Sequence, residues 1–294
     1  MQTTIEEYLH GLRVELKGSD AAIVQDALSD AREHFTLALA AARESGLQGN
    51  DTQALAAIIE EFGTPAETAQ AYREIERRTA VRSSRAMRPR SGLGAFFGVY
   101  TDGRAWSALL YMLIAFETGS LYFVWVLAGS VFSAFFALFV FGLPLALAFL
   151  LSIRALALLE GRLVEALLGV RMPRRPLVLL EHAKWKDQLK ALLLDKDTWR
   201  TLLYVALHFV LGCAYVVLLI AAIGFSVVLV SVPITQEVVG EGAVMLGGEA
   251  VFWPRWSYAL CVPGGLLLWT IFMHVARGIA DWHGRMAKRL LVWE

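Results

Sequence analysis

The chain has 294 residues, of which 57% are hydrophobic and 18% are charged, and its mean hydropathy is +0.53. Soluble globular proteins average about 45–50% apolar residues, so this composition predicts a membrane protein and excludes a disordered or highly charged nucleic-acid-binding chain. The net charge is zero, but residues 1–79 carry −7 and residues 80–294 carry +7. An acidic soluble domain joined to a basic membrane domain is therefore expected.

The acidic segment, residues 1–79, has helical periodicity throughout. Apolar residues recur at spacings of 3–4 from Ile5 to Leu16, which predicts a first helix. A second helix is expected to end near Ser45 and Gly46, and a short third helix to cover 54–62. A fourth begins at Pro65, because proline is favoured at the first helical position. We predict that residues 1–79 form a small helical bundle.

No catalytic or metal-binding constellation is found in this helical segment. His10 and His34 lack metal-ligand spacing to each other. The many carboxylates predict a solvated face, and the alternative is a docking surface for a basic partner.

Residues 80–104 are rich in Arg, Ser and Gly and are expected to form a linker. A basic cluster precedes the first long apolar run: Arg82, Arg85, Arg88 and Arg90. Each such charge contributes about 1 kcal/mol to binding near anionic lipid. We therefore expect these arginines at the membrane interface, and we expect no direct contact with nucleic acid.

Four apolar runs follow, each near the roughly 20 residues that a membrane-spanning helix needs. They cover 105–127, 131–153, 201–230 and 257–276. A very short turn is expected at 128–130, and an amphipathic basic stretch at 154–200 separates the second and third runs. We predict an all-α fold, in which the small helical bundle precedes a four-helix polytopic membrane domain that covers residues 105–294.

The membrane domain contains an internal duplication, with repeat one at 102–170 and repeat two at 195–291. Residues 102–124 match 195–217 with nine identities in 23 positions. A second match aligns 154–168 with 277–291, two amphipathic basic helices whose arginines are expected at the membrane interface. Those arginines are Arg154, Arg162, Arg277 and Arg285. Each hairpin is expected to return to its starting side, so we predict two parallel two-span repeats rather than inverted ones.

Positive charge predicts the orientation in the membrane. Of the 27 Lys and Arg residues, 26 fall in the first 104 residues, in 154–200 or after residue 276, and only Arg255 lies elsewhere. We therefore predict a multi-pass protein of the bacterial inner membrane with both termini in the cytoplasm. The outer loop, 231–256, is Gly-rich and alternates apolar residues, which predicts a short hairpin.

Three ionisable residues within the spans are candidates for an intramembrane switch. Glu117 lies near the middle of the first span, His208 at comparable depth in the third, and His274 nearer the cytoplasmic end of the fourth. Ionisable groups at such depths are costly and are functional candidates by default. A proton-linked pair of Glu117 with His208 is one hypothesis. The alternative is a neutral Glu117 hydrogen-bonded to Ser or Thr, with histidines that join helices.

The chain lacks four common catalytic motifs. It has no GxxxxGK[ST], H-E-x-x-H, GxSxG or kinase signature, so we expect no enzymatic activity. Its two cysteines, Cys213 and Cys261, lie in apolar runs and form no metal motif. We predict no cofactor, no metal and no catalytic residue.

Two resemblances follow from particular motifs. The membrane domain carries W-x2-L-L-Y in its first span, R-x-L-A-x2-E-G-R-L-x3-L-L-G at 154–169 and D-x3-W-x2-L-L-Y at the third span. With these motifs, residues 95–291 resemble the bacterial "putative sensor" membrane domain. Residues 1–79, with YL-x2-L, ALSDAREHF and EEFGTPAETAQAY, resemble a HAAS-type helical signalling domain. The second resemblance implies a PadR-like transcription regulator as the cytoplasmic partner.

The first functional hypothesis is therefore a non-enzymatic sensor or signalling protein of the inner membrane. It would pass an envelope or membrane signal to a cytoplasmic partner through its acidic domain. The alternative is a small transporter or exporter accessory subunit with a proton-linked site at Glu117 and His208. A membrane scaffold is a third hypothesis, and the sequence leaves the oligomeric state open.

Overall fold

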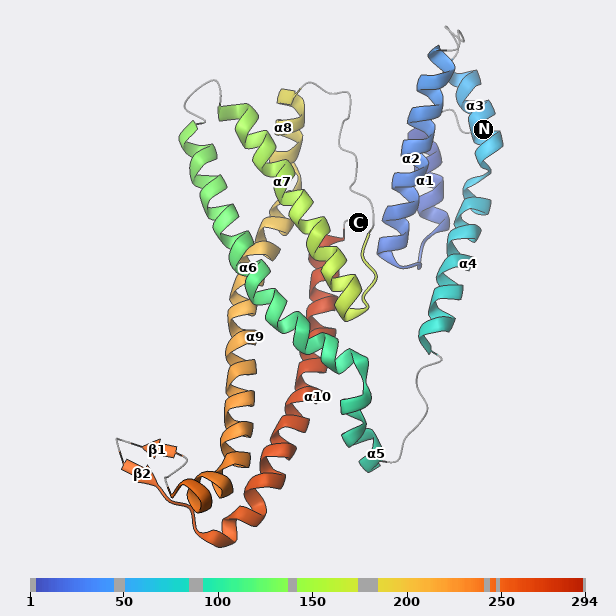
Figure 1. The fold of residues 1–294 in the computed structure, drawn as a ribbon. Coiled ribbons are helices and arrows are strands. Elements are labelled where there is room, and N and C mark those ends of the chain that lie inside the picture. Colours follow the sequence, from blue (N-terminus) through green and yellow to red (C-terminus); the bar gives the residue numbers. More distant parts are fainter. Residues whose placement is uncertain are drawn as a thin grey trace.

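The computed structural model describes residues 4–44, 51–84, 92–136, 142–173, 185–240, 244–246 and 249–292. The N-terminal part, called the head below, consists of four helices (Figure 1). They are α1 (Ile5–Glu15), α2 (Ala21–Glu44), α3 (Asp51–Phe62) and α4 (Pro65–Ser84). The helical bundle predicted for the head is confirmed, and α4 extends five residues past the expected end at residue 79.

Local capping explains where the helices of the head begin. The hydroxyl of Thr4 accepts a hydrogen bond from the amide of Glu7 at 3.2 Å, and the carboxylate of Asp20 accepts one from Ala22 at 2.9 Å. Thr64 and Glu67 form a reciprocal capping box at the start of α4. Each cap satisfies amides that a helix leaves unpaired at its N-terminus.

The head has its own hydrophobic core. Its largest fully buried side chains include Tyr8, Leu12 and Phe35, and the Tyr8 ring lies edge-on to Phe35 at 4.7 Å between centroids. The Tyr8 hydroxyl donates a hydrogen bond to the carbonyl of Gly63 at 2.9 Å and therefore joins α1 to the turn between α3 and α4. Burial raises the pKa of Tyr8 above its ordinary value of 10.0.

The membrane part, called the body below, is built around four long helices. They are α6 (Gly103–Phe136), α7 (Gly142–Leu163), α9 (Lys196–Ile234) and α10 (Tyr258–Leu291). Two short helices, α5 (Gly92–Phe97) and α8 (Trp185–Leu194), precede α6 and α9. The four long helices are apolar and long enough to cross a membrane, which confirms the four predicted spans.

Two boundaries of the predicted spans are wrong. Residues 128–130 lie inside α6, which continues to Phe136, so they form no turn. A single Gly129-Ser130 pair between strong apolar residues does not end a helix. The predicted amphipathic helix after the second span is also not a separate element, because α7 runs through Arg154 to Leu163 and continues in a π-helical turn, Val164–Leu168.

Close packing of α6 on α9 joins the two halves of the body. A methyl group added at Gly212 would lie 2.5 Å from the carbonyl oxygen of Ala115, and one added at Gly119 would lie 2.9 Å from the Cα of Phe209. Small residues allow the backbones of membrane helices to approach in this way. Because residue numbers rise along α6 as they fall along α9, the two helices are antiparallel at this crossing.

The two helical hairpins extend in different directions from this crossing (Figure 1). Helix α7 returns along α6, and α10 returns along α9. The predicted parallel orientation of the two repeats is therefore not confirmed.

Residues that carry the sequence duplication make equivalent contacts in its two copies. Trp106 donates a hydrogen bond to the carbonyl of Tyr100 at 2.9 Å, and Trp199 donates one to Leu193 at the same distance. Asp195 caps α9 by accepting from the amide two residues later, and the aspartate that precedes α6 does the same for its helix. The same sequence pattern therefore has the same local structure at the start of both long helices.

The loop between α9 and α10 contains a short antiparallel hairpin. Strand β1 (Val244–Leu246) pairs with β2 (Glu249–Val251), and Val244 lies opposite Val251. The hairpin predicted in the outer loop is confirmed.

The outward surface of the four long helices is strongly apolar. Large side chains such as Leu121, Val210 and Phe225 are all more than 60% exposed. A soluble protein rarely exposes such a continuous apolar surface, whereas lipid accommodates it. The chain is therefore a multi-pass membrane protein with a helical head.

Candidate functional site

A buried set of polar side chains lies where the four long helices meet. The central polar cluster consists of Tyr111 and Thr118 from α6, Glu160 from α7, Tyr204, His208 and Tyr215 from α9, and His283 from α10. Glu160 is 1% exposed, and both histidines are fully buried. Buried polar groups in a membrane domain are costly and mark functional sites by default.

Glu160 is the only carboxylate in the central polar cluster. Tyr111 donates a hydrogen bond to Glu160 Oε1 at 2.7 Å, and Tyr204 donates to the same oxygen at 3.3 Å. The second oxygen, Oε2, lies 3.6 Å from His208 Nε2. No hydrogen-bond partner of Oε2 is found among the described residues. A buried acceptor without a hydrogen bond costs about 1–3 kcal/mol. This oxygen is therefore a candidate position for binding a hydrogen-bond donor or a cation.

His283 is held by three tyrosines. Its Nε2 lies 2.7 Å from the hydroxyl of Tyr111 and 3.1 Å from that of Tyr204, while its Nδ1 lies 2.9 Å from that of Tyr215. These contacts fix the plane of the imidazole ring and place Nε2 beside the two hydroxyls that donate to Glu160 Oε1.

Glu160, His208 and His283 could hold a metal ion. One ligand atom from each lies within 4.8 Å of the other two. A carboxylate with two imidazoles is a common donor set for divalent transition metals. The arrangement is also able to function as a hydrogen-bond network that couples four helices.

Sequence reasoning does not identify Glu160 or His283 as site residues. Both lie in the matched amphipathic helices at equivalent positions, each immediately before the shared Gly-Arg pair of repeat one or repeat two. The position carries an acidic residue in one copy and a histidine in the other. An ionisable residue at the same place in both repeats is the sequence feature that points to a site. Tyr111 and Tyr204 are likewise equivalent, so the central polar cluster combines matching residues of both repeats.

The structure separates the three predicted switch residues. Glu117 is exposed on the outward face of α6, whereas His208 contacts Thr118 at 3.0 Å and lies beside Glu160. In the structure His208 therefore lies beside Glu160, and not beside Glu117 as one of the two hypotheses has it. Neighbouring residues of a helix point in different directions, so Thr118 faces His208 while Glu117 points away from it. His274 lies elsewhere, 2.9 Å from the carbonyl of Phe96 and stacked on that ring.

The predicted interface arginines have different surroundings. Arg154 is buried and pairs with Asp195 at 2.6 Å, because α7 packs beside the start of α9. Arg154 is therefore held in an ion pair inside the protein. Arg277 pairs with Asp102 at 3.1 Å, and Arg162 lies 3.4 Å from Glu165. Arg285 donates to the carbonyl of Asp281 at 3.1 Å. Arg85, Arg88, Arg90 and the side chain of Arg82 lie outside the described residues.

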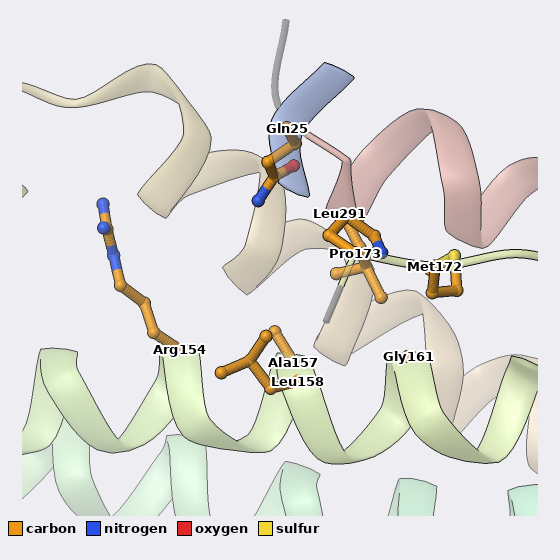
Figure 2. A pocket seen from close by; sticks show the side chains of 8 residues that line it. All are labelled: Gln25, Arg154, Ala157, Leu158, Gly161, Met172, Pro173 and Leu291. Atoms are coloured by element: carbon orange, nitrogen blue, oxygen red, sulfur yellow. The ribbon is translucent and has the colours of Figure 1, made fainter. Parts of the chain in front are cut away.

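The head contacts the body through the first turns of α2. Lys288 of α10 pairs with Asp20, and Arg171, which follows α7, lies 4.0 Å from Asp26. Figure 2 shows the adjacent small pocket, in which Gln25 of α2 faces α7. Its other lining residues are Arg154, Ala157, Leu158, Gly161, Met172, Pro173 and Leu291. The acidic head therefore docks on basic residues of its own body.

Comparisons with known proteins match two separate parts of the chain. The family model described as "Putative sensor" matches residues 111–291, and the model described as HAAS matches residues 7–71. No curated protein and no solved structure matches the chain at a significant level.

Proposed function

Since the chain belongs to the "Putative sensor" family and carries a HAAS domain, we propose that it is a non-enzymatic sensor of the bacterial inner membrane. In this proposal the body responds to an envelope or membrane signal, and the head reports the response to a cytoplasmic protein. A PadR-like transcription regulator is the proposed partner, as the HAAS resemblance implies.

One structural observation carries the proposal. Helix α10 contributes His283 to the central polar cluster and, five residues later, Lys288 to the ion pair with Asp20 of the head. A shift of α10 at the central polar cluster therefore moves a residue that holds the head. Close-packed helices transmit such shifts because they do not deform continuously.

The central polar cluster is suited to change state. It joins all four long helices through groups that exchange hydrogen bonds, and Glu160 Oε2 has no such bond in the described residues. Any event that changes the partners of Glu160 alters contacts to α6 and α9 together. The head is then released from, or bound more tightly to, Arg171 and Lys288.

The proposed orientation places the head in the cytoplasm. Three segments that the charge distribution assigns to that side meet in the structure, namely the head, Arg171 and Lys288. This meeting supports the assignment, because the linked segments must lie on one side of the membrane. The β1–β2 hairpin would then face outward.

Affinity purification from native membranes tests the proposal. The full chain is compared with a chain that begins at residue 80, and captured proteins are identified by mass spectrometry. We expect a transcription regulator with the full chain and its loss with the shortened chain, provided that both chains give a monodisperse size-exclusion peak. Equal capture by both chains would remove the role of the head.

The geometry does not favour the transport alternative. That alternative depends on a proton-linked Glu117–His208 site, and Glu117 is exposed away from the central polar cluster. Purified protein in proteoliposomes decides the matter, since a pH-dependent flux that Glu117→Gln abolishes would favour transport.

A further inference from the structure

We propose that Glu160, His208 and His283 form a binding site for one divalent transition-metal ion of the Zn²⁺ type. The site lies in the body, at the crossing of the four long helices, and goes beyond the proposed signalling role. Metal binding does not require the head or a partner protein.

The donor set and its spacing fit a single ion. Two imidazoles and a carboxylate leave a fourth position open, a pattern found in zinc sites. Bonds of about 2.0–2.2 Å to one ion place neighbouring donors roughly 3.3–3.6 Å apart. The distance between Glu160 Oε2 and His208 Nε2 is 3.6 Å, and all three donors lie within 4.8 Å of one another.

Burial and charge also favour a cation. Glu160 is 1% exposed, and its Oε2 has no hydrogen-bond partner among the described residues. In the same part of the chain, its charged or polar neighbours are His208 and the tyrosines, and no Lys or Arg pairs with it. A buried carboxylate is costly unless a counter-charge compensates it, and a divalent cation supplies that charge.

Surrounding tyrosines orient the ligands as outer partners do in known metal sites. Tyr215 lies 2.9 Å from His283 Nδ1 and holds the imidazole ring, so Nε2 is the ligating nitrogen. Binding the ion requires Nε2 to exchange its contacts with the hydroxyls of Tyr111 and Tyr204, at 2.7 and 3.1 Å, for the metal. Tyr111 donates to Glu160 Oε1 at 2.7 Å and so leaves Oε2 as the ligating oxygen. The hydroxyl of Tyr204, 3.1 Å from His283 Nε2, is a candidate for the open position.

The competing interpretation is a polar network that holds four helices together without an ion. Both interpretations predict that Glu160→Gln reduces stability, so stability alone does not separate them. Only the metal site predicts a stoichiometric ion and a characteristic spectrum. The choice of ion follows from the ligands, since imidazole and carboxylate accept Zn²⁺, Co²⁺ and Fe²⁺.

The test uses the full chain in detergent, with any histidine tag removed. After equilibration with Zn²⁺ and desalting, we expect about one Zn²⁺ per chain by inductively coupled plasma mass spectrometry. Co²⁺ is expected to give visible d–d bands of a four- or five-coordinate site and to be displaced by Zn²⁺. Less than a tenth of an equivalent of Zn²⁺, together with a Co²⁺ spectrum identical to that of the hexaaqua ion, would overturn the proposal.

Matched variants locate the site. Glu160→Gln and His283→Gln are expected to weaken Zn²⁺ binding at least tenfold. His274→Gln, on the same helix as His283 but bonded to Phe96, and the exposed Glu117→Gln are expected to bind as the wild type does. Equal loss in the control variants, or full binding by Glu160→Gln, contradicts the assignment. If a ligand variant fails to give a monodisperse peak, the wild-type stoichiometry and Co²⁺ spectrum decide alone.

These outcomes separate the metal site from the proposed function. Metal binding is measured without a partner, and partner capture is measured without added metal. A chain that binds Zn²⁺ but captures no regulator supports the site and removes the signalling role. A chain that captures a regulator but binds no metal supports the signalling role and removes the metal site.

Discussion

Lys288, in the last turn of α10, forms an ion pair with Asp20, the residue that caps α2 of the head. The pair connects two residues that are far apart in the sequence, and Ala21 packs against the core of the body beside it. The acidic partner belongs to residues 1–79, which carry a net charge of −7, and the basic partner belongs to residues 80–294, which carry +7.

Neutralising this pair is expected to loosen the head without unfolding it. Asp20→Asn keeps an oxygen for the cap on Ala22, and Lys288→Met keeps the length of the side chain. Both partners are 25% exposed, so the loss is about 1 kcal/mol or less, which corresponds to roughly a fivefold rise in local opening. Hydrogen exchange of the α2 amides measures this rise. Lys17→Met, an exposed change in the same head, should leave those amides unchanged.

The glycine crossing gives a prediction about stability. Gly212→Ala would place a methyl group 2.5 Å from the backbone oxygen of Ala115, so we expect a loss of about 1–3 kcal/mol. Gly224→Ala on the same helix has no atom within 4 Å of the new methyl group and should gain about 0.5–1 kcal/mol from its higher helix propensity. Apparent melting temperatures in detergent compare the two. If Gly212→Ala melts with or above Gly224→Ala, the close approach of α6 and α9 is wrong.

The elements were largely predictable from the sequence, for identifiable physical reasons. The helix that starts at Pro65 follows from proline and capping chemistry, and the four spans follow from apolar length. The boundary at 128–130 failed because a Gly-Ser pair is a weak signal inside a strongly apolar run, and α6 continues to Phe136. Local signals therefore located the helices more reliably than their ends.

The site was less predictable because it depends on packing between distant segments. Depth along a span selects Glu117, but only the helical phase shows that Thr118 faces His208 instead. Glu160 lies in a charged stretch that resembles a surface helix, and its burial depends on the crossing of α7 with α6 and α9. The residue pattern of one helix does not show how that helix crosses the others.

The head should respond to acid through Glu67. Hydrogen bonds from the amide and the hydroxyl of Thr64 lower the pKa of this exposed carboxylate below its ordinary value of 4.5. A lowered pKa in the folded state means that its contribution is present above pH 4.5 and is lost as pH falls through 4.5 towards the folded pKa. Thermal unfolding of a fragment of residues 1–84, followed by circular dichroism from pH 6 to 3, should show this loss.

A matched pair of variants isolates the effect of Glu67. Glu67→Gln keeps a capping acceptor but does not titrate, so the acid-induced loss should become smaller. Glu61→Gln, an exposed change on α3, should retain the full loss. Identical pH profiles for the two variants would contradict the assignment to the capping box.

The two equivalent arginines of the repeats should differ in their contribution to stability. Arg154 is 8% exposed and pairs with Asp195, whereas Arg277 is 33% exposed and pairs with Asp102. Replacing Arg154 removes its charge-assisted hydrogen bonds to Asp195 and Thr198 inside the protein, a loss of about 3 kcal/mol, while a partly exposed pair contributes about 1 kcal/mol or less. We therefore expect Arg154→Met to lower the apparent melting temperature by roughly 6–12 °C and Arg277→Met by less than about 4 °C. Equal shifts would mean that the pseudo-symmetric contacts are also energetically equivalent, which the difference in burial argues against.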